Sequence, residues 1–381
     1  MAMNTEVLVI GGGITGLAVA FELARSGRRV ALYEARRIGA MASGATLGGI
    51  RQSGRHPAEL PLARAAVGLW GELEGRLGAP TGYRRTGNLR LARSAAEAAT
   101  ILRMVRAQRA LGLEIDYLAD PKDIGALAPG LGNGVLAASF CPSDGQAEPT
   151  AVLTAYVKAL RRLGVAIHEA EPARTVVVER GRVNGIETGG GRVAAPNVVL
   201  AAGIDSNRLL APLGLAVPLA IPEVVGFRTL PRPPRLGPVI GVANAEIAFR
   251  QQTDGSFRVT GAAAGDAVAG RPRGPRLGAL ARLLDAFSAL LPEAADVPLA
   301  ESWIGFLDQT PDALPVIEAC DEPRGLVLAF GFSGHGFALG PIVGRLVAEM
   351  VAGRSPELSV EAFRRDRFGR QGFPAGVTLH G

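Results

Sequence analysis

The sequence predicts a mixed α/β protein in which a Rossmann-like nucleotide-binding domain is joined to a second domain built on an antiparallel sheet. Two observations predict it: a strand–glycine–helix–strand pattern at residues 5–35, and strand-like segments separated by turn residues in the middle of the chain. The 381 residues are enough for two domains of ordinary size. An apolar fraction of 48% with only 5% aromatic residues indicates a core of aliphatic side chains.

The N-terminal pattern is typical of a phosphate-binding turn. VLVI at residues 7–10 is an aliphatic run typical of a buried strand, and residues 15–26 have helical apolar spacing. Between them, Gly11 would make the tight turn, Gly13 would let the backbone approach a pyrophosphate, and Gly16 would allow close helix–strand packing. The start of the helix would offer free N–H groups and a partial positive charge to the phosphates.

The second strand of the pattern, residues 29–34, ends in Glu34, about 20 residues after the glycines, where a carboxylate can accept from a ribose hydroxyl. An acid at this position disfavours the 2′-phosphate of NADP, whereas NAD and FAD both fit the pattern. Two more small-residue loops favour the longer FAD: ARRIGAMASGATLGGIRQSGR (35–55) and GFSGHGFALG (331–340). They suit a ligand extended across the fold.

The composition excludes several other classes. The net charge of +6 comes without basic runs interleaved with aromatic residues, so we expect no nucleic-acid binding. A solvated basic surface, or a face for an acidic partner protein, accounts for the excess. Cys141 and Cys320 are far apart and outside any CxxC spacing, so we expect no disulfide framework, no metal site and a reducing cytoplasm. No apolar run approaches the ~20 residues of a membrane span, and the apolar N-terminal segment lacks the basic flank of a signal peptide.

Strand-like segments in the middle of the chain predict the second domain. They are RRTGNLRLA (84–92), EIAFRQQTDGSFRVTGA (246–262) and AESWIGFL (300–307), and the DG pair within the second predicts a hairpin turn. The proline-rich LPRPPRLGP (230–238) is interpreted as a loop between strands rather than a docking motif.

With these motifs in hand, the chain resembles the D-amino-acid oxidase-like FAD flavoprotein family, and within it the glycine oxidase and sarcosine oxidase branch. It is most similar in kind to FAD subunits of multi-subunit amine dehydrogenases: sarcosine oxidase β, opine oxidase and proline or D-hydroxyproline dehydrogenase. Beyond the N-terminal pattern, the resemblance rests on ASGATLGGIRQ (42–52), VVLAAG (198–203), SWIGFLDQTPDALPVI (302–317), GFSGHGFALGPIVGRLVAEMVAG (331–353) and FRRDRF (363–368).

The resemblance implies an FAD-binding domain of the glutathione-reductase type, assembled from residues 1–79, 145–210 and 315–381. Residues 80–144 and 211–314 would form the substrate domain. FAD would be bound non-covalently, because Gly305 stands where a flavin-linking cysteine would fall. The implied cofactor contacts are Gly11, Gly13, Ile14, Thr15, Gly16, Glu34, Ala35, Arg36, Ala42, Ser43, Thr46, Gly48, Gly49, Ile50, Thr175, Val176, Ala202, Gly203, Gly331, Ser333, Gly334, His335, Gly336 and Phe337.

The implied reaction is oxidation of the C–N bond of an amino acid, expected to be a secondary one such as D-hydroxyproline, proline, sarcosine or an opine, by hydride transfer to flavin N5. Arg51 is the first candidate to bind the substrate carboxylate and Arg250 the second. His335 would lie beside the flavin, as a packing or electrostatic element or as a proton carrier. Residues 341–351 would form a helix whose N-terminus points at flavin N1 and O2.

Two departures from the family pattern bear on substrate and acceptor. Leu307 replaces the usual carboxylate-binding arginine, and the next residue, Asp308, would meet a cationic group on a larger substrate or cap a turn. Oxygen-reactive members place a lysine over the flavin, where this chain has Val259. Electrons are therefore expected to go to other redox subunits of a hetero-oligomer rather than mainly to O₂.

Some alternatives and minor assignments remain at this stage. The alternatives are an amino-acid oxidase that uses O₂ directly, a non-catalytic FAD-holding subunit and an NAD-dependent dehydrogenase. We expect a cytoplasmic protein, with attachment to the inner membrane through a partner left open. The remaining histidines are expected on the surface: His56, His168 and His380.

Overall fold

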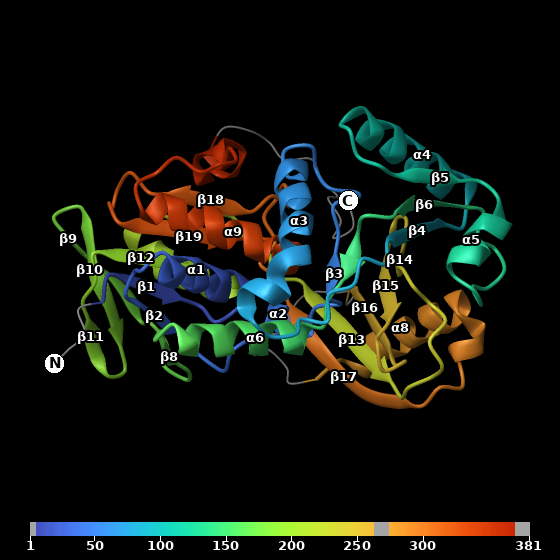
Figure 1. Cartoon of the computed structure of the whole chain (residues 1–381), viewed down its shortest axis with the longest axis horizontal. Helices are drawn as coiled ribbons and strands as arrows, with labels where there is room; N and C mark the ends of the chain where they lie inside the picture. Colours follow the sequence, from blue (N-terminus) through green and yellow to red (C-terminus); the bar gives the residue numbers. More distant parts are fainter. Residues whose placement is uncertain (1–4, 263–273, 370–381) are drawn as a thin grey trace.

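The computed structural model describes residues 5–262 and 274–369 (Figure 1). A sheet covered by helices occupies one half of the molecule, and a larger, mainly antiparallel sheet occupies the other half. Residue 380 and the other residues outside these ranges are not described further, so the assignment of His380 to the surface lies outside the described residues.

The first sheet, called here the nucleotide sheet, is parallel except at one edge, where β18 runs antiparallel to β19. β1 lies at its centre, paired in parallel with β2 on one side and β12 on the other, which confirms the two strands predicted at the N-terminus. In spatial order the strands are β18 (Val316–Ala319), β19 (Leu326–Phe330), β12 (Asn197–Leu200), β1 (Val7–Ile10), β2 (Val30–Tyr33) and β8 (Ala166–His168).

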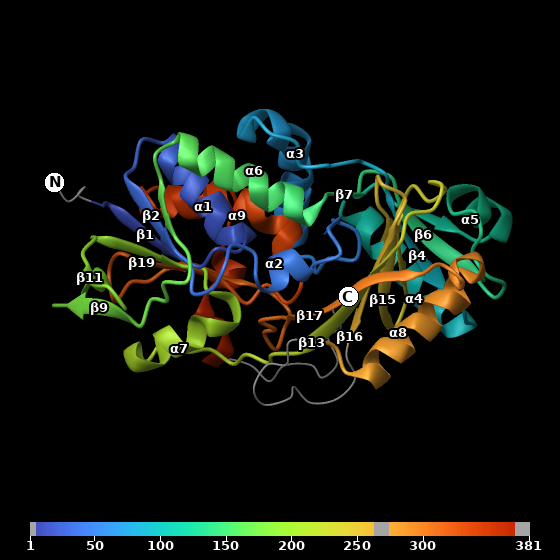
Figure 2. The same cartoon turned by 90° about the horizontal axis from the view of Figure 1, so that it is seen from below.

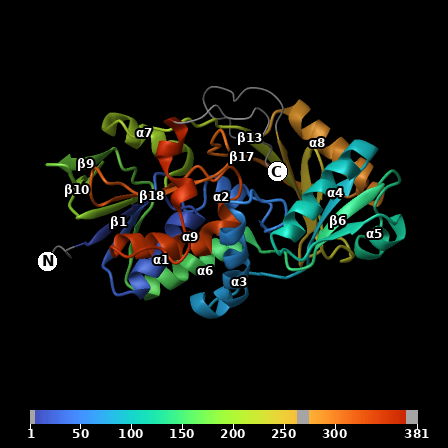
Figure 3. The same cartoon turned by 90° about the horizontal axis from the view of Figure 1, so that it is seen from above.

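Helices α1 (Ile14–Arg25), α9 (Gly336–Val351) and α6 (Pro149–Arg162) cover one face of this sheet, and α3 (Leu60–Leu77) packs on α9 (Figure 3). The other face is covered by a small antiparallel sheet of β9 (Thr175–Glu179), β10 (Arg182–Thr188) and β11 (Gly191–Val193). The continuous aliphatic runs of the central strands follow from this cover on both faces.

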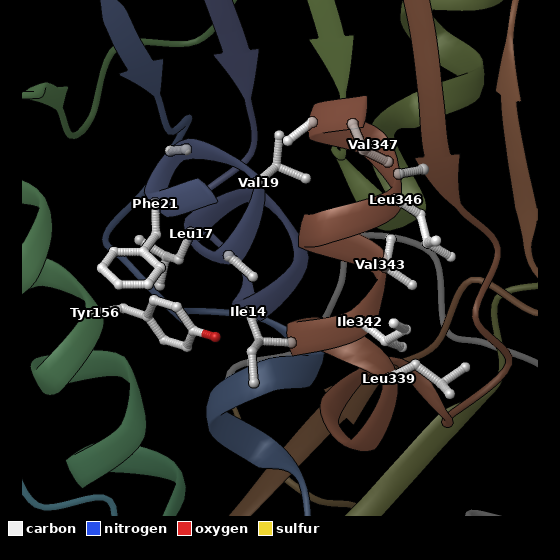
Figure 4. Close-up of a cluster of buried hydrophobic side chains, with 14 of the residues drawn as sticks. Ile14, Leu17, Val19, Phe21, Tyr156, Leu339, Ile342, Val343, Leu346 and Val347 are labelled. Atoms are coloured by element: carbon white, nitrogen blue, oxygen red, sulfur yellow. The ribbon is translucent and has the colours of Figure 1, made fainter. Parts of the chain in front are cut away.

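The closest helix contact joins α1 to α9, two segments more than 300 residues apart in the sequence (Figure 4). Ile14 and Val19 of α1 point toward the α9 face that carries Val343 and Val347. The two backbones approach closely because Gly344 has no side chain: a Cβ there would lie 2.7 Å from the carbonyl carbon of Ala18. This contact fixes how the two helices lie against each other.

The start of α9 differs from the sequence prediction. The helix was expected from residue 341, with the proline at its first turn, whereas it begins at Gly336 and contains Pro341. Because proline has no N–H group, Pro341 cannot donate the helical hydrogen bond to the carbonyl oxygen of Phe337, four residues earlier. The five additional residues bring the helix N-terminus next to His335, its N-cap residue.

The second, larger sheet confirms the strands predicted in the middle of the chain. The proline-rich segment connects β13 to β14, and Asp254–Gly255 lie in the turn between β15 and β16, as predicted. In spatial order the strands are β17 (Leu299–Phe306), β13 (Glu223–Thr229), β16 (Phe257–Ala262), β15 (Ala245–Gln251), β14 (Val239–Val242), β4 (Asn88–Ala92), β6 (Ala137–Cys141) and β5 (Asp116–Leu118).

Helix α8 (Leu277–Leu290) packs against this larger sheet through Phe287, whose ring lies 5.2–5.6 Å from those of Phe227, Phe249 and Phe257. The remaining helices are α4 (Ala95–Ala110), α5 (Pro121–Leu127) and α7 (Ser206–Leu210), with 3-10 turns at Gly203–Asp205, Ala211–Leu213, Pro292–Ala294, Glu361–Phe363 and Arg365–Gly369. Among the helices of the described ranges, none is long and apolar enough to cross a membrane.

The two sheets meet around a short helix, α2 (Ala42–Ala45), and the small sheet of β3 (Gly49–Ile50) and β7 (Gly145–Gln146) (Figure 2). The strands of the nucleotide sheet come from the segments assigned to the FAD domain, and those of the larger sheet come from the segments assigned to the substrate domain. The domain boundaries themselves stay a prediction.

The α1–α9 contact predicts a reversal of the usual effect of alanine in a helix. Gly344→Ala should lower Tm, because a clash with the backbone of Ala18 costs about 1–3 kcal/mol. Gly68→Ala on α3 should raise Tm, because its Cβ meets nothing within 4 Å and alanine is favoured over glycine in helices by about 1 kcal/mol. Thermal unfolding of both variants tests this; an equal or higher Tm for Gly344→Ala would contradict it.

Candidate cofactor and substrate site

One elongated cavity runs from the carboxyl ends of the nucleotide-sheet strands to the face of the larger sheet. Glu34, Arg36 and Asp205 line its first end, and the turn from Gly11 to Thr15 lines its middle. Its far end is lined by His335, by arginines and by residues of β4, β14, β15 and β16. Loops from both halves of the molecule therefore form one continuous site.

The phosphate-binding turn has the geometry that the glycine spacing predicts. Gly11 adopts φ +112°, and a Cβ there would lie 2.2 Å from the carbonyl oxygen of Ala201. Gly13 and the first residues of α1 line the cavity, and the Ile14 N–H donates to Ser43 Oγ at 3.0 Å. Gly16 does not line the cavity, because it packs against Gly11, and its Cβ would lie 2.0 Å from the Gly11 oxygen.

The Glu34 carboxylate is fixed at the end of β2 by backbone donors. Oε2 accepts from Gly12 N–H and Oε1 accepts from Arg36 N–H, both at 2.7 Å. Each oxygen keeps a lone pair for a further donor such as a ribose hydroxyl. The Arg36 guanidinium pairs with Asp205 at 3.0 Å and closes this end of the cavity. The narrow backbone turn, the helix N-terminus and this carboxylate fit the adenosine and pyrophosphate of FAD.

The loop before α9 contacts the cavity through part of its length. Gly334, His335, Gly336 and Phe337 line the cavity, whereas Gly331 and Ser333 do not. The last two hold the loop in place: the Gly331 N–H donates to Asp308 Oδ2 at 2.6 Å, and the Ser333 N–H donates to the Asp308 carbonyl oxygen.

Asp308 itself therefore makes the turn-capping contact, one of the two roles that its position in the sequence left open. Its side chain is buried and also lines the cavity. Burial raises the pKa of this carboxyl to about 6, against the opposing effect of the backbone hydrogen bond from Gly331.

Three arginines, called here the arginine wall, line the far end of the cavity: Arg51, Arg55 and Arg90. Gly54 lies between two of them, since a Cβ there would be 2.8 Å from Arg51 Nη1 and 3.0 Å from Arg90 Nη2. Burial lowers the pKa of Arg90 to about 10 and also lowers the pKa of Arg51, with the neighbouring arginines adding to both effects. Within the described residues, Arg55 Nη1 is buried and has no hydrogen-bond partner.

Asp144 and Glu59 are buried carboxylates beside the arginine wall. Asp144 Oδ1 accepts from Gln52 N–H at 2.8 Å and its Oδ2 accepts from Ser53 Oγ at 2.5 Å. Glu59 Oε1 lies 3.7 Å from Arg55 Nε. The cluster made by the arginine wall with Asp144 and Glu59 therefore contains three guanidinium groups and two carboxylates, a formal charge of +1.

Arg250, the second sequence candidate for the carboxylate, lies outside the cavity lining and is fully buried. A guanidinium has five N–H donors, and five hydrogen bonds are formed by them: to the carbonyl oxygens of Leu47 and Ala147, to Gln146 Oε1, and to both oxygens of Glu148. No donor is left for a substrate, so this assignment is corrected to a structural one. Arg51 lines the cavity as expected.

Val259 also corrects a sequence assignment. It is buried in the core under α8, so it does not stand over the cavity. Its neighbour Thr260 lines the cavity instead, because successive side chains of a strand point to opposite faces. The chain has only two lysines, Lys122 in α5 and Lys158 in α6, and neither lines the cavity.

Some expected cofactor contacts lie away from the cavity. Thr175 and Val176 belong to β9, and Ala173, two residues earlier, lines the cavity in their place. Gly48 turns at φ +86° against the backbone of Ala147, and Ile50 is buried in the core. The expected contacts that do line it are Gly11, Gly13, Ile14, Thr15, Glu34, Ala35, Arg36, Ala42, Ser43, Thr46, Gly49, Ala202, Gly203, Gly334, His335, Gly336 and Phe337.

Four other residues named in the sequence analysis have clear positions. His56 is exposed, whereas His168 is only half-exposed and stacks on Tyr33 with ring centroids 4.4 Å apart. Gly305 and Leu307 both line the cavity, and a Cβ on Gly305 would lie 2.8 Å from that of Ala45. The sequence analysis missed Arg55 and Arg90. Arg55 could have been found from its spacing of four residues after Arg51, and Arg90 from its place within a predicted strand.

Comparison with known proteins identifies the family. Residues 6–350 match the family model of DAO, the FAD dependent oxidoreductases. The chain belongs to this family. It is an FAD-dependent amino acid oxidoreductase.

The similar proteins differ in activity. The chain is 27% identical to glycine oxidase from Bacillus licheniformis, covering 96% of this chain and 98% of that protein. The crystal structure of glycine oxidase from Geobacillus kaustophilus superposes with a TM-score of 0.90 at 26% identity, covering 96% and 99% of the two chains. That of L-proline dehydrogenase from P. horikoshii superposes with a TM-score of 0.89 at 27% identity, covering 98% and 100%.

The raised pKa of Asp308 predicts a pH-dependent stability difference. A carboxyl whose pKa is 3.8 when unfolded and about 6 when folded contributes stability below pH 4 that is lost as the pH rises through 6. Asp308→Asn keeps an acceptor for the Gly331 N–H without titrating. The Tm of this variant relative to the parent protein should therefore rise between pH 4.5 and 7.5.

Asp285→Asn, an exposed site on α8, is the matched control and should show a constant difference in Tm. Thermal unfolding at several pH values measures both variants. If the two variants show the same pH dependence, Asp308 is not the buried, titrating group described above.

Proposed function

We propose that this protein is a dehydrogenase that oxidises the C–N bond of a secondary amino acid and passes the electrons to a partner protein rather than mainly to O₂. The observation that carries the proposal is the arginine wall at the far end of the cavity, next to small apolar side chains of the larger sheet. D-hydroxyproline, proline, sarcosine and opines are the substrates that we place in this class.

The arginine wall supports binding of one carboxylate. Its cluster with Asp144 and Glu59 contains three guanidinium groups and two carboxylates, a formal charge of +1, and Arg55 Nη1 has no partner among the described residues. A substrate carboxylate would balance that charge and accept hydrogen bonds from the forked guanidinium groups. Leu307 offers no such charge on the other side of the cavity, so the carboxylate would turn toward Arg51 and its neighbours.

Small apolar side chains next to Arg90 support a small apolar group on the substrate. Val239 and Ala248 line the cavity from β14 and β15, and β14 pairs with the strand that carries Arg90. They would orient the substrate's ring or N-methyl group and exclude water from the reacting carbon. FAD, when bound, supplies the hydride acceptor for that carbon. The work of this chain is to hold the amino acid with its carboxylate at the arginine wall and its α-carbon toward the cofactor.

The electron acceptor is inferred from the residues that line the cavity. Neither lysine of the chain lies there, so the lysine that oxygen-reactive relatives place over the flavin has no counterpart. Transfer to other redox subunits of a complex follows as the proposal. The similarity to L-proline dehydrogenase supports it, whereas the similarity to glycine oxidases favours the second candidate, direct use of O₂.

Non-covalent FAD is proposed because Cys141 and Cys320 lie outside the cavity lining.

Anaerobic titration tests the activity. The flavin absorbance of the purified protein should bleach with at least one of sarcosine, L-proline, D-proline, cis-4-hydroxy-D-proline and octopine. The reduced protein should then reoxidise slowly in air and rapidly with an artificial electron acceptor. Absence of bleaching by the whole panel would overturn the proposed class, and rapid reoxidation in air would establish the oxidase alternative.

Substitution of Arg51 tests the carboxylate site. Arg51→Lys keeps the charge and loses the forked pair of donors, so the substrate Kd from rapid-reaction flavin reduction should rise about 10- to 100-fold, the value of one charge-assisted hydrogen bond. The limiting rate of reduction should change less. Arg85→Lys, an exposed position, is the matched control. An unchanged Kd would place the carboxylate elsewhere in the cavity.

A further inference from the structure

His335 and Glu59 form a buried pair that the binding of substrate and cofactor does not by itself require. His335 Nδ1 lies 3.0 Å from Glu59 Oε2, and the two residues are 7% and 0% exposed. His335 lines the cavity, whereas Glu59 lies behind it, immediately before α3. Among the described residues, His335 Nε2 is buried and has no hydrogen-bond partner.

The pair specifies which nitrogen of the ring carries the proton. Burial would raise the pKa of Glu59, but the charges of His335 and Arg55 outweigh this effect and lower the pKa to about 2. Glu59 is therefore a carboxylate and can only accept a hydrogen bond. In the neutral ring, Nδ1 must carry the hydrogen, so Nε2 keeps an unshared electron pair available to a group in the cavity.

Oxidation of an amino acid requires such an acceptor. At neutral pH the substrate amine is protonated, and its nitrogen lone pair must be free for the C=N bond to form as hydride leaves the α-carbon. Among the described residues that line the cavity, His335 is the only side chain with a nitrogen base that lacks a partner. The other nitrogen-containing side chains of the lining are arginines and the amide of Asn88. The arginine wall also disfavours a second positive charge nearby.

We propose that Glu59 and His335 form a proton-accepting dyad, in which His335 Nε2 takes a proton from the substrate ammonium group and Glu59 positions the ring. The N–H bond of the substrate breaks, its electron pair stays on the amine nitrogen, and a new N–H bond forms at Nε2. The resulting imidazolium remains hydrogen-bonded to Glu59 and later releases its proton to water. The inference rests on the proposed function, and it assigns a catalytic role to His335 and a positioning role to Glu59.

The charged groups around the ring define the pH behaviour. Burial lowers the pKa of His335, Arg55 and Arg51 lower it further, and Glu59 raises it. Of the other acids on elements packed against α9, Glu318 on β18 and Glu22 on α1 pair with Arg365 and Arg76. On α3, Glu74 accepts from the N–H groups of Thr81 and Gly82, and Glu72 is exposed. His335 is therefore neutral and able to accept a proton at pH 7. Removing the charge of Glu59 should lower its pKa further and weaken it as a base.

Nuclear magnetic resonance of the protein with ¹⁵N-labelled histidine tests the tautomer without reference to activity. The chain has four histidines, so comparison with His335→Asn assigns the signal. The expected spectrum at pH 7.5 shows His335 with hydrogen on Nδ1, and Glu59→Gln should lower the pKa of this ring. Hydrogen on Nε2 in the parent protein, or an unchanged pKa in Glu59→Gln, would overturn the dyad.

Rapid-reaction flavin reduction tests the proton transfer with a substrate that reduces the parent protein. His335→Asn should lower the reduction rate at pH 7 about 100-fold, a usual contribution of a positioned base. The rate should approach that of the parent protein at pH 10, where the substrate amine is already neutral. Glu59→Gln should lower the rate at pH 7 about tenfold, one pKa unit of basicity. Equal losses at both pH values would indicate a merely structural role and overturn the inference.

Matched controls separate the possible failures. Glu72→Gln makes the same change at an exposed position on α3, and His56→Asn makes the same change at an exposed histidine. Both should keep the rate and pH profile of the parent protein, and FAD content and circular dichroism confirm folding of every variant. If no amino acid reduces the parent protein, the proposed function fails. If the parent is reduced and His335→Asn keeps its rate at pH 7, only the dyad fails.

Discussion

The close packing of α1 on α9 is the constraint on which the rest of the site depends. Gly344 lets α9 approach the backbone at Ala18, and a Cβ on Gly340 would lie 2.8 Å from Ile14. This contact joins the two ends of the chain and places both helix N-termini at one cavity. Each N-terminus offers unpaired N–H groups and a partial positive charge. The first faces the phosphate-binding turn, and the second brings His335 to the far end of the same cavity.

Charge balance then determines what the far end can bind. Burying a charged group is unfavourable unless it is paired. Asp144 and Glu59 balance part of the arginine wall and leave one positive charge beside the cavity. A substrate bound through one carboxylate, as proposed, would complete the balance. The acids also orient the wall, since Asp144 accepts from the backbone of Gln52 and Ser53, next to Arg51 in the sequence.

The sequence predicted those features that depend on neighbouring residues. The glycine spacing, the strand ending in Glu34 and the hairpin turn at Gly255 are local, and the structure confirms the strands, helix and turn that they predict. The choice among arginines was not local. Arg250 is bound by Glu148, about a hundred positions away, and only the fold brings them together. The sequence analysis expected Val259 at the cavity, but the next residue, Thr260, lines it. An error of one residue in a strand is enough for this, because successive side chains face opposite sides of the sheet.

The arginines proposed to bind the substrate carboxylate also affect the transfer of a proton from the substrate. Arg55 and Arg51 lower the proton affinity of His335, and they would equally disfavour an ammonium group on the substrate. The site therefore favours a neutral amine. It also needs a base that can still accept a proton although the neighbouring positive charges lower its pKa. Glu59 supplies the opposing negative charge at Nδ1, on the far side of the ring from the cavity. Because Glu59 sits immediately before α3, which packs on α9, the helices that place the cofactor turn also place the base.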